Sequence, residues 1–263
     1  MNTRSASVRL PVAHDTDAPV VSVDIVGDVS DAERSYVHRK LTSLAGNLPG
    51  PPHVRARLTA TAADGIRASV VQANLLINGW QIARTQVAGT AIRQAAYLTA
   101  WRLEEQLKRA ADPRGVRPWP EPSCRNRPVP RLVLANDRLI VREKRVQLMR
   151  TDPVAAAWAM DTMDYDFHLF VNAETGEDSV VYRVGPTGYR LASLCSATMP
   201  AEDGCIPWTV NVHPIPTLTP RQAVTRLNET DLPFRFFKDA ESGRGNVLYQ
   251  RLDGHYALLS PVD

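Results

Sequence analysis

Hydrophobic and polar residues follow two spacings along the first half of the chain. The segment 20–27, VVSVDIVG, is rich in β-branched residues and is typical of a strand. Residues 53–61, HVRARLTAT, alternate apolar and polar side chains, as half-buried strands do. Residues 67–77 and 80–87 are two more apolar-rich segments, joined by an Asn-Gly dipeptide that favours a tight hairpin turn. Four strands are therefore expected before residue 90.

Two helices are expected among these strands. Ser30 with Glu33 three residues later forms a capping-box motif, which predicts a helix start. The apolar residues of this helix then recur at helical spacing: Tyr36, Val37, Leu41, Leu44 and Leu48. A second, longer helix is expected over 88–111. The order β-α-β-β-β-α predicts an α+β domain over 19–112, a two-layer sandwich similar to double-stranded RNA-binding domains, with both helices on one face.

A proline-rich segment separates this domain from the rest of the chain. Residues 113–131 contain six prolines and five arginines, which exclude a helix or a central strand and predict an extended, semi-rigid linker over 113–138. Trp119 in this segment is interpreted as an anchor against a domain rather than a stacking surface. A flexible N-terminal tail is expected over 1–18.

The second half of the chain repeats itself. With an offset of 67 residues, 153–193 aligns with 220–260 without a gap, and 13 of the 41 pairs are identical. The repeat predicts two small α+β modules, over 139–197 and 206–263. A unit of about this size buries little core alone, and its apolar strands favour a partner.

The two copies are therefore expected to pack on each other as a pseudo-symmetric dimer within one chain. Pairing within the chain would occupy the surface that a homodimer needs, so a homodimer is less favoured. The residues expected at the pairing interface are the apolar and aromatic strand residues shared by both copies: Phe167, Phe170, Val180, Tyr182, Phe234, Phe237, Val247 and Tyr249.

The charge of the chain is unevenly distributed. The net charge is +3, but residues 1–140 hold 19 Lys and Arg against 12 Asp and Glu, whereas residues 141–263 hold 12 against 16. A basic half followed by an acidic half indicates that the first half faces a polyanion. The basic residues expected to contact RNA lie on the two helices, on the strand between residues 80 and 87, and after the second helix: Arg34, Arg39, Lys40, Arg84, Arg102, Lys108, Arg109, Arg114 and Arg117.

Motifs for catalysis, cofactors or metals are not evident. The paired carboxylates Asp164/Asp231 and Glu174/Glu241 are better interpreted as turn and cap residues than as acid–base catalysts. Three cysteines at scattered spacings fit no metal template, and reduced thiols are expected. No catalytic residue, metal site or cofactor is therefore predicted. The sequence also contains no signal peptide or membrane span, so the expected location is cytoplasmic.

One stretch resembles a known family. Residues 164–194, DYDFHLFVNAETGEDSVVYRVGPTGYRLASL, are similar to the C-terminal domain of long-form ribosome hibernation promoting factors, in the elements N-A-E-T-G, V-V-Y-R and G-x-Y-x-L at the family's spacing. Residues 141–148 fit the entry into that domain. Weaker similarity lies at Lys40-Leu41 and at 103–108. The duplicated C-terminal module resembles the dormancy- and hypoxia-associated translation inhibitors of actinobacteria.

The resemblance implies a binding protein rather than an enzyme. The first domain would bind ribosomal RNA of the small ribosomal subunit, in the channel for messenger and transfer RNA, with Lys40 and the basic end of the second helix in contact. It would inhibit translation and stabilise inactive ribosomes under stress, with neither DNA nor a membrane as a partner. Because the two modules are expected to pair within the chain, we expect single ribosomes rather than ribosome dimers.

Two other functions stay open from the residues alone. In one, the tandem modules bind a small ligand or a regulatory protein, and the basic half is incidental. In the other, the chain is an enzyme acting on RNA, which the lack of a clustered acid, base or metal set disfavours.

Overall fold

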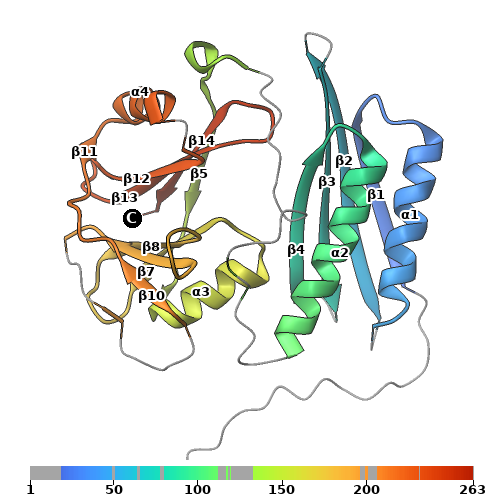
Figure 1. The fold of residues 1–263 in the computed structure, drawn as a ribbon, viewed down its shortest axis with the longest axis horizontal. Helices are drawn as coiled ribbons and strands as arrows, with labels where there is room; N and C mark the ends of the chain where they lie inside the picture. Colours follow the sequence, from blue (N-terminus) through green and yellow to red (C-terminus); the bar gives the residue numbers. More distant parts are fainter. Residues whose placement is uncertain are drawn as a thin grey trace, which may run out of the picture.

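The computed structural model describes most of the chain, namely residues 19–48, 51–63, 66–77, 80–111, 117, 119, 133–195, 199–200, 206–230 and 232–262. The expected tail over 1–18 and most of the expected linker, including Arg114, lie outside these residues. An N-terminal domain lies beside a unit built from the two modules (Figure 1).

The N-terminal domain has the predicted order β-α-β-β-β-α. Its elements are β1 (Val20–Gly27), α1 (Asp31–Ala45), β2 (Pro52–Ala63), β3 (Ile66–Ile77), β4 (Trp80–Gly89) and α2 (Ile92–Ala111). The strands form one sheet in the order β1-β2-β3-β4, in which β1 is parallel to β2 and the other neighbours are antiparallel. The α+β fold class is confirmed.

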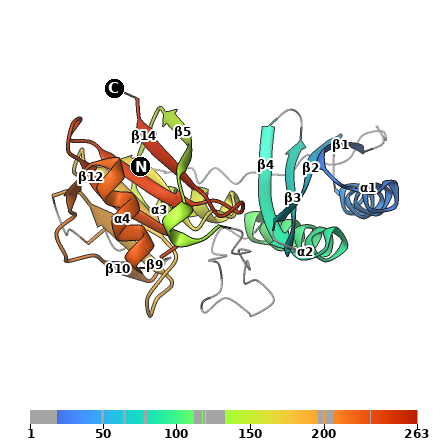
Figure 2. The ribbon, with the colours of Figure 1, turned by 90° about the horizontal axis from the view of Figure 1, so that it is seen from above.

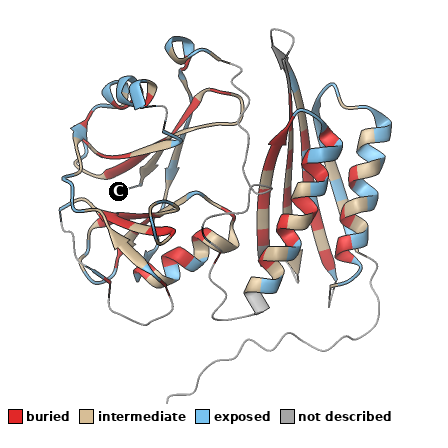
Figure 3. Ribbon diagram, in the orientation of Figure 1, coloured by how far each residue is buried: buried red, intermediate tan, exposed pale blue. Residues whose placement is uncertain are grey.

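Both helices cover the same face of this sheet (Figures 1 and 2). The capping box predicted at Ser30 and Glu33 is present at the start of α1. Val37 and Leu41 of α1 and Leu103 of α2 are buried against apolar strand residues in one core. Figure 3 shows the buried residues on the inward sides of the helices and in the strands that they cover.

The two modules contribute equivalent elements. The first supplies β5 (Ile140–Val146), β6 (Arg150–Thr151), α3 (Pro153–Thr162), β7 (Phe167–Asn172), β8 (Asp178–Tyr182) and β9 (Tyr189–Ser193). The second supplies β10 (Trp208–Val210), β11 (Thr217–Leu218), α4 (Pro220–Thr230), β12 (Phe234–Asp239), β13 (Gly245–Gln250) and β14 (Tyr256–Pro261). A short 3-10 helix, η2 (Ala135–Asp137), precedes them.

The modules exchange their first strands. The two sheets have the orders β10-β9-β8-β7-β6 and β11-β12-β13-β14-β5. Thus β5, which begins the first module in sequence, pairs in parallel with β14 of the second, and β10 pairs in parallel with β9 of the first. Each exchanged strand covers an edge of the other module's sheet, which would otherwise present unpaired backbone groups. The expected boundaries 139–197 and 206–263 therefore divide the sequence but do not divide the sheets.

The two sheets pack face to face between the two helices, with α4 outside one sheet and α3 outside the other (Figure 1). Six of the eight expected pairing residues lie in the cluster between the sheets, namely Phe167, Val180, Tyr182, Phe234, Val247 and Tyr249. The rings of Phe167 and Phe234 are 4.8 Å apart between centroids, and those of Tyr182 and Phe234 are 5.3 Å apart. Aromatic side chains from both modules thus meet at the centre of the interface.

The expectation does not hold for Phe170 and Phe237. Phe170 is buried under α3 in the first module's own core, and Phe237 is buried under α4 in the second. Side chains along a strand alternate between the two faces of its sheet. Because Phe167 and Phe234 face the other module, residues three positions later face the helix instead.

Trp119, from the expected linker, anchors against the first module. Its Nε1 donates a hydrogen bond of 2.6 Å to the backbone oxygen of Gly185, and the Arg183 guanidinium lies 5.1 Å from its ring centroid. A Cβ at Gly188 would come within 2.5 Å of the Trp119 ring. The anchoring interpretation therefore describes this side chain better than a free stacking surface.

The described residues were also compared with the requirements of a membrane-spanning helix, a metal site and a disulfide. None of the helices in the described ranges combines the length and apolar character needed to cross a membrane. Within those same ranges, no group of three or more His, Cys, Asp or Glu side chains is placed to share a metal ion. Cys195 is exposed and has a free thiol, whereas Cys124 and Cys205 fall outside the residues described.

Candidate nucleic-acid interface and the contact between the domains

Basic and aromatic side chains meet on the outer surface of the two helices. Lys40 of α1 lies over the ring of Tyr97 of α2, with its Nζ 5.4 Å from the centroid, and the guanidinium of Arg93 of α2 lies 5.4 Å from the ring centroid of Tyr36 of α1. These four residues form a surface that we call the helix patch. Arg93 and Tyr97 are exposed, whereas Tyr36 and Lys40 are half-buried.

The spacing within each helix creates the helix patch. Tyr36 and Lys40 are four residues apart on α1, and Arg93 and Tyr97 are four residues apart on α2, so each pair lies on one face of its helix. Cations neutralise phosphates, and aromatic rings stack on bases or sugars. The helix patch therefore has the chemistry of a nucleic-acid contact. Of its members, only Lys40 was expected from the sequence to contact RNA.

Two other expected RNA contacts lie further around α1. Arg34 and Arg39 are exposed and line a shallow hollow together with Asp31, Ser35 and His38. The basic side chains of this hollow extend the positive surface of α1 beyond the helix patch. Asp31 at the helix N-terminus interrupts it.

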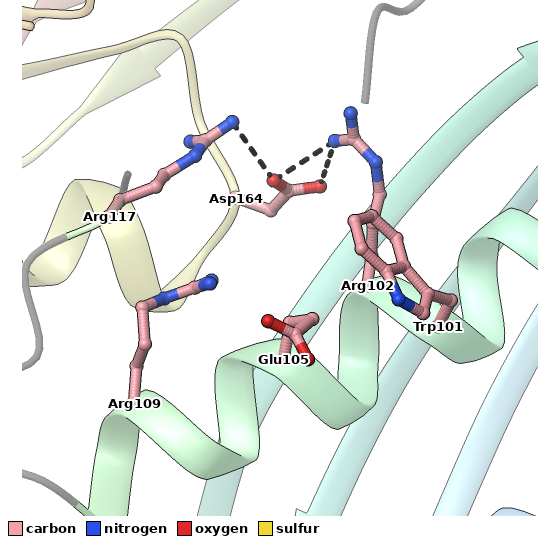
Figure 4. A pocket seen from close by; sticks show the side chains of 6 residues that line it. All are labelled: Trp101, Arg102, Glu105, Arg109, Arg117 and Asp164. Carbon is pink, nitrogen blue, oxygen red and sulfur yellow. Dashed lines mark hydrogen bonds and ion pairs between the residues drawn. The ribbon is translucent and has the colours of Figure 1, made fainter. Parts of the chain in front are cut away.

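A buried ion cluster joins the N-terminal domain to the first module (Figure 4). Asp164, between α3 and β7, accepts hydrogen bonds from Arg102 of α2 at 2.8 and 3.1 Å and from the Thr85 hydroxyl of β4 at 2.6 Å. Arg117, from the expected linker, lies 3.4 Å from the other side of the carboxylate. The side chains of Asp164 and Arg102 are 4% exposed, and that of Arg117 is 2% exposed. We call Thr85, Arg102, Arg117 and Asp164 the interdomain cluster.

Arg102 and Arg117 are therefore not on an RNA-accessible surface in this arrangement. Both were expected to contact RNA because they are basic and belong to the basic half of the chain. Their buried positions are explained by the carboxylate between them, since buried arginines are rarely found without such a partner. In this structure they hold the two domains together.

Asp164 has a backbone conformation that favours glycine, which indicates that its carboxylate has a role that glycine could not fill. Asp164 has a φ of 53°, in the left-handed region, directly after α3. The amide of Tyr165 donates to the Met160 oxygen at 2.9 Å and that of Asp164 to the Asp161 oxygen at 3.2 Å, which is the helix-ending arrangement that usually has glycine at this position. An aspartate costs more here than glycine, and the interdomain cluster accounts for its presence. The interpretation of Asp164 as a turn residue is correct for its backbone and incomplete for its carboxylate.

The remaining expected contacts are dispersed. Arg84 lies on the sheet face that the helices leave open, next to the first module, where its guanidinium is 5.3 Å from the Tyr165 ring centroid. Lys108 is exposed and pairs with Glu105 at 3.0 Å, one turn earlier on α2. Arg109 lines the small pocket beside the interdomain cluster. The nine expected residues thus do not form one surface, and Arg114 falls outside the described residues.

The roles of two residues, Arg93 and Asp164, were not predicted from the sequence. Arg93 sits in an otherwise unremarkable part of α2, and its helical spacing to Tyr97 was the available signal. Asp164 was noticed only as half of a repeated pair. Its ionic role depends on residues 62 and 79 positions earlier, and no spacing in the sequence indicates such a contact.

Comparisons with known proteins agree with the repeated architecture. A family model described as "Sigma 54 modulation/S30EA ribosomal protein C terminus" matches residues 135–191 and again 209–258. The chain is 38% identical over 259 residues to proteins of two Mycobacterium tuberculosis strains, each named "Dormancy associated translation inhibitor". The aligned region covers 95% of this chain and 91% of each relative.

Among solved structures, the N-terminal domain of Thermus thermophilus Protein Y matches 34% of this chain and 97% of its own length at 24% identity, with a TM-score of 0.28. The near full-length similarity to the two mycobacterial proteins and the double match to the S30EA model carry the assignment. The chain belongs to the long-form ribosome hibernation promoting factor family, in the group with a duplicated C-terminal module.

Proposed function

We propose that this protein is a ribosome hibernation factor that binds the ribosome, inhibits translation and stabilises inactive ribosomes under stress or dormancy. The observation that carries the proposal is the 38% identity, over 95% of the chain, to proteins named dormancy associated translation inhibitors. The N-terminal domain binds ribosomal RNA of the small subunit in the channel for messenger and transfer RNA. It acts by occupying that channel, so its action requires no chemical step.

The helix patch supports an RNA contact on the helical face of the N-terminal domain. Lys40 and Arg93 provide two cations on neighbouring helices, and Tyr36 and Tyr97 hold them by cation–π contacts. Double-stranded RNA is recognised largely through its phosphates and its shape. A preformed pair of cations at the surface of a rigid two-helix layer suits such recognition.

Binding to isolated ribosomal subunits tests the proposal. The full chain should pellet with small subunits and not with large subunits, with an affinity that falls as salt rises because counterions are released on binding. A Lys40→Glu/Arg93→Glu variant should lose most of this binding, whereas Arg221→Glu, an exposed residue on α4 of the second module, should not. Equal binding to both subunits, or binding that is insensitive to salt and to the first variant, would contradict the proposal.

A further inference from the structure

The approximate twofold axis between the modules can be located from the repeat. Residues 67 positions apart are counterparts, and in a symmetric pair only residues at the axis contact their own counterparts. Phe167 contacts its counterpart Phe234. Asp178, at the start of β8, contacts its counterpart Gly245, at the start of β13, because the Gly245 amide donates a 2.8 Å hydrogen bond to Asp178 Oδ2. The axis therefore passes close to both pairs.

The charges at this axis differ between the modules. Arg244 binds Asp178 through two hydrogen bonds of 2.8 and 3.1 Å, and the Asp178 side chain is only 5% exposed. The counterpart of Arg244 in the first module is Glu177. If the first module paired with a second copy of itself, Asp178 and Glu177 from each copy would bring four carboxylates together without an arginine. Like charges brought together in a partly dry interface disfavour association.

The sizes of counterpart side chains at the interface also favour pairing of unlike modules. A Cβ at Gly245 would lie 2.8 Å from the Asp178 Cβ, so a side chain at both counterpart positions does not fit. The cluster between the sheets also contains two counterpart pairs of unequal size. Leu169 of the first module corresponds to Phe236 of the second, and Ala192 corresponds to Leu259. In these two pairs the second module supplies the larger side chain. Two first modules would therefore collide at Asp178 and leave space unfilled around Leu169 and Ala192, and two second modules would overpack the cluster.

We propose that Asp178, Arg244 and Gly245 make the module interface heterotypic, so that the first module fits the second module of its own chain and not a second copy of itself. The pairing surface is then satisfied within each chain, and two chains cannot join through two identical modules; they could join only by exchanging unlike modules. This inference concerns module pairing and holds whether or not the chain binds ribosomes. Together with the proposed function, it gives one silenced ribosome per chain.

Cross-linking of the full chain tests which modules meet. In a background with all three cysteines replaced by serine, Phe167→Cys places one thiol at the axis, and Phe167→Cys/Phe234→Cys places two. With a short bismaleimide, the double variant should be linked within a monomer, and the single variant should give no covalent dimer. A covalent dimer from either variant, or no internal link in the double variant, would overturn the inference.

Charge exchange tests whether the named residues cause the selectivity. Asp178→Arg alone and Arg244→Asp alone each create a like-charged pair, and both should lower the thermal midpoint of the full chain. Asp178→Arg/Arg244→Asp restores opposite charges while Gly245 keeps its space open, and should recover most of the lost midpoint. If the double variant melts no higher than the single variants, the assignment to Asp178 and Arg244 is wrong.

Discussion

Removing the charge of Asp164 should separate the N-terminal domain from the tandem modules. Asp164→Asn removes the charged carboxylate that Arg102 and Arg117 share, so Arg117 keeps the more distant Asp161 carboxylate at 4.0 Å and Arg102 loses its ion pair across the domain contact. Asp164→Gly removes the same carboxylate and also suits the left-handed backbone at φ 53°. Loss of one partner of a buried ion pair costs about 3–5 kcal/mol. The two arginines can avoid this cost by reaching water, which requires the domains to part.

The magnitude predicts a large shift in domain arrangement rather than unfolding. At about 1.4 kcal/mol per tenfold change, the equilibrium between docked and separated domains should shift by a factor of about 100 or more. Small-angle X-ray scattering of the full chain should show a larger radius of gyration for both Asp164 variants, with each domain still folded by circular dichroism. Asp137→Asn, at an exposed aspartate, is the matched control. Scattering profiles of both Asp164 variants that superpose on that of the native chain would refute the reasoning.

Three further predictions follow from single contacts. Lys40→Glu/Arg93→Glu removes two charge-assisted contacts worth about 1.5–3 kcal/mol each, so the dissociation constant for small subunits should rise at least about a hundredfold, as titration would show. Burial lowers the pKa of His168 below its ordinary 6.5. The unfolded chain therefore binds more protons than the folded chain as the pH falls below about 6.5, so the thermal midpoint should decrease as the pH is lowered through this range. The decrease should be less steep in His168→Gln, which has no imidazole to titrate. Gly188→Ala should lower the thermal midpoint, because the residue has a φ of +83° and its Cβ would collide with Trp119; an unchanged midpoint would contradict this contact.

The local patterns of the sequence predicted the N-terminal fold well. Alternation at 53–61 and the capping box at Ser30 depend on interactions between near neighbours, so their meaning does not change with tertiary context. The repeat indicated two modules for the same reason. The exchange of β5 and β10 was not predictable, because the sheet that each strand joins is decided by contacts with residues distant in the sequence.

The candidate site was harder to predict because charge alone does not reveal exposure. Arg102 and Lys108 belong to the same helix and looked equivalent in sequence, yet one is buried against Asp164 and the other lies in solvent. Phe167 and Phe170 looked equivalent in the repeat, yet strand alternation places them on opposite faces of one sheet. In both cases the deciding partner is distant in the sequence.

Sedimentation of the full chain with intact ribosomes through a sucrose gradient, followed by detection of the protein across the gradient, tests the central claim most directly. The account predicts that the protein travels with single ribosomes and that no faster ribosome dimer peak appears. Protein that stays at the top of the gradient at low salt would contradict ribosome binding. Protein that drives ribosomes into a dimer peak would leave the family assignment intact and contradict the pairing of the modules within one chain.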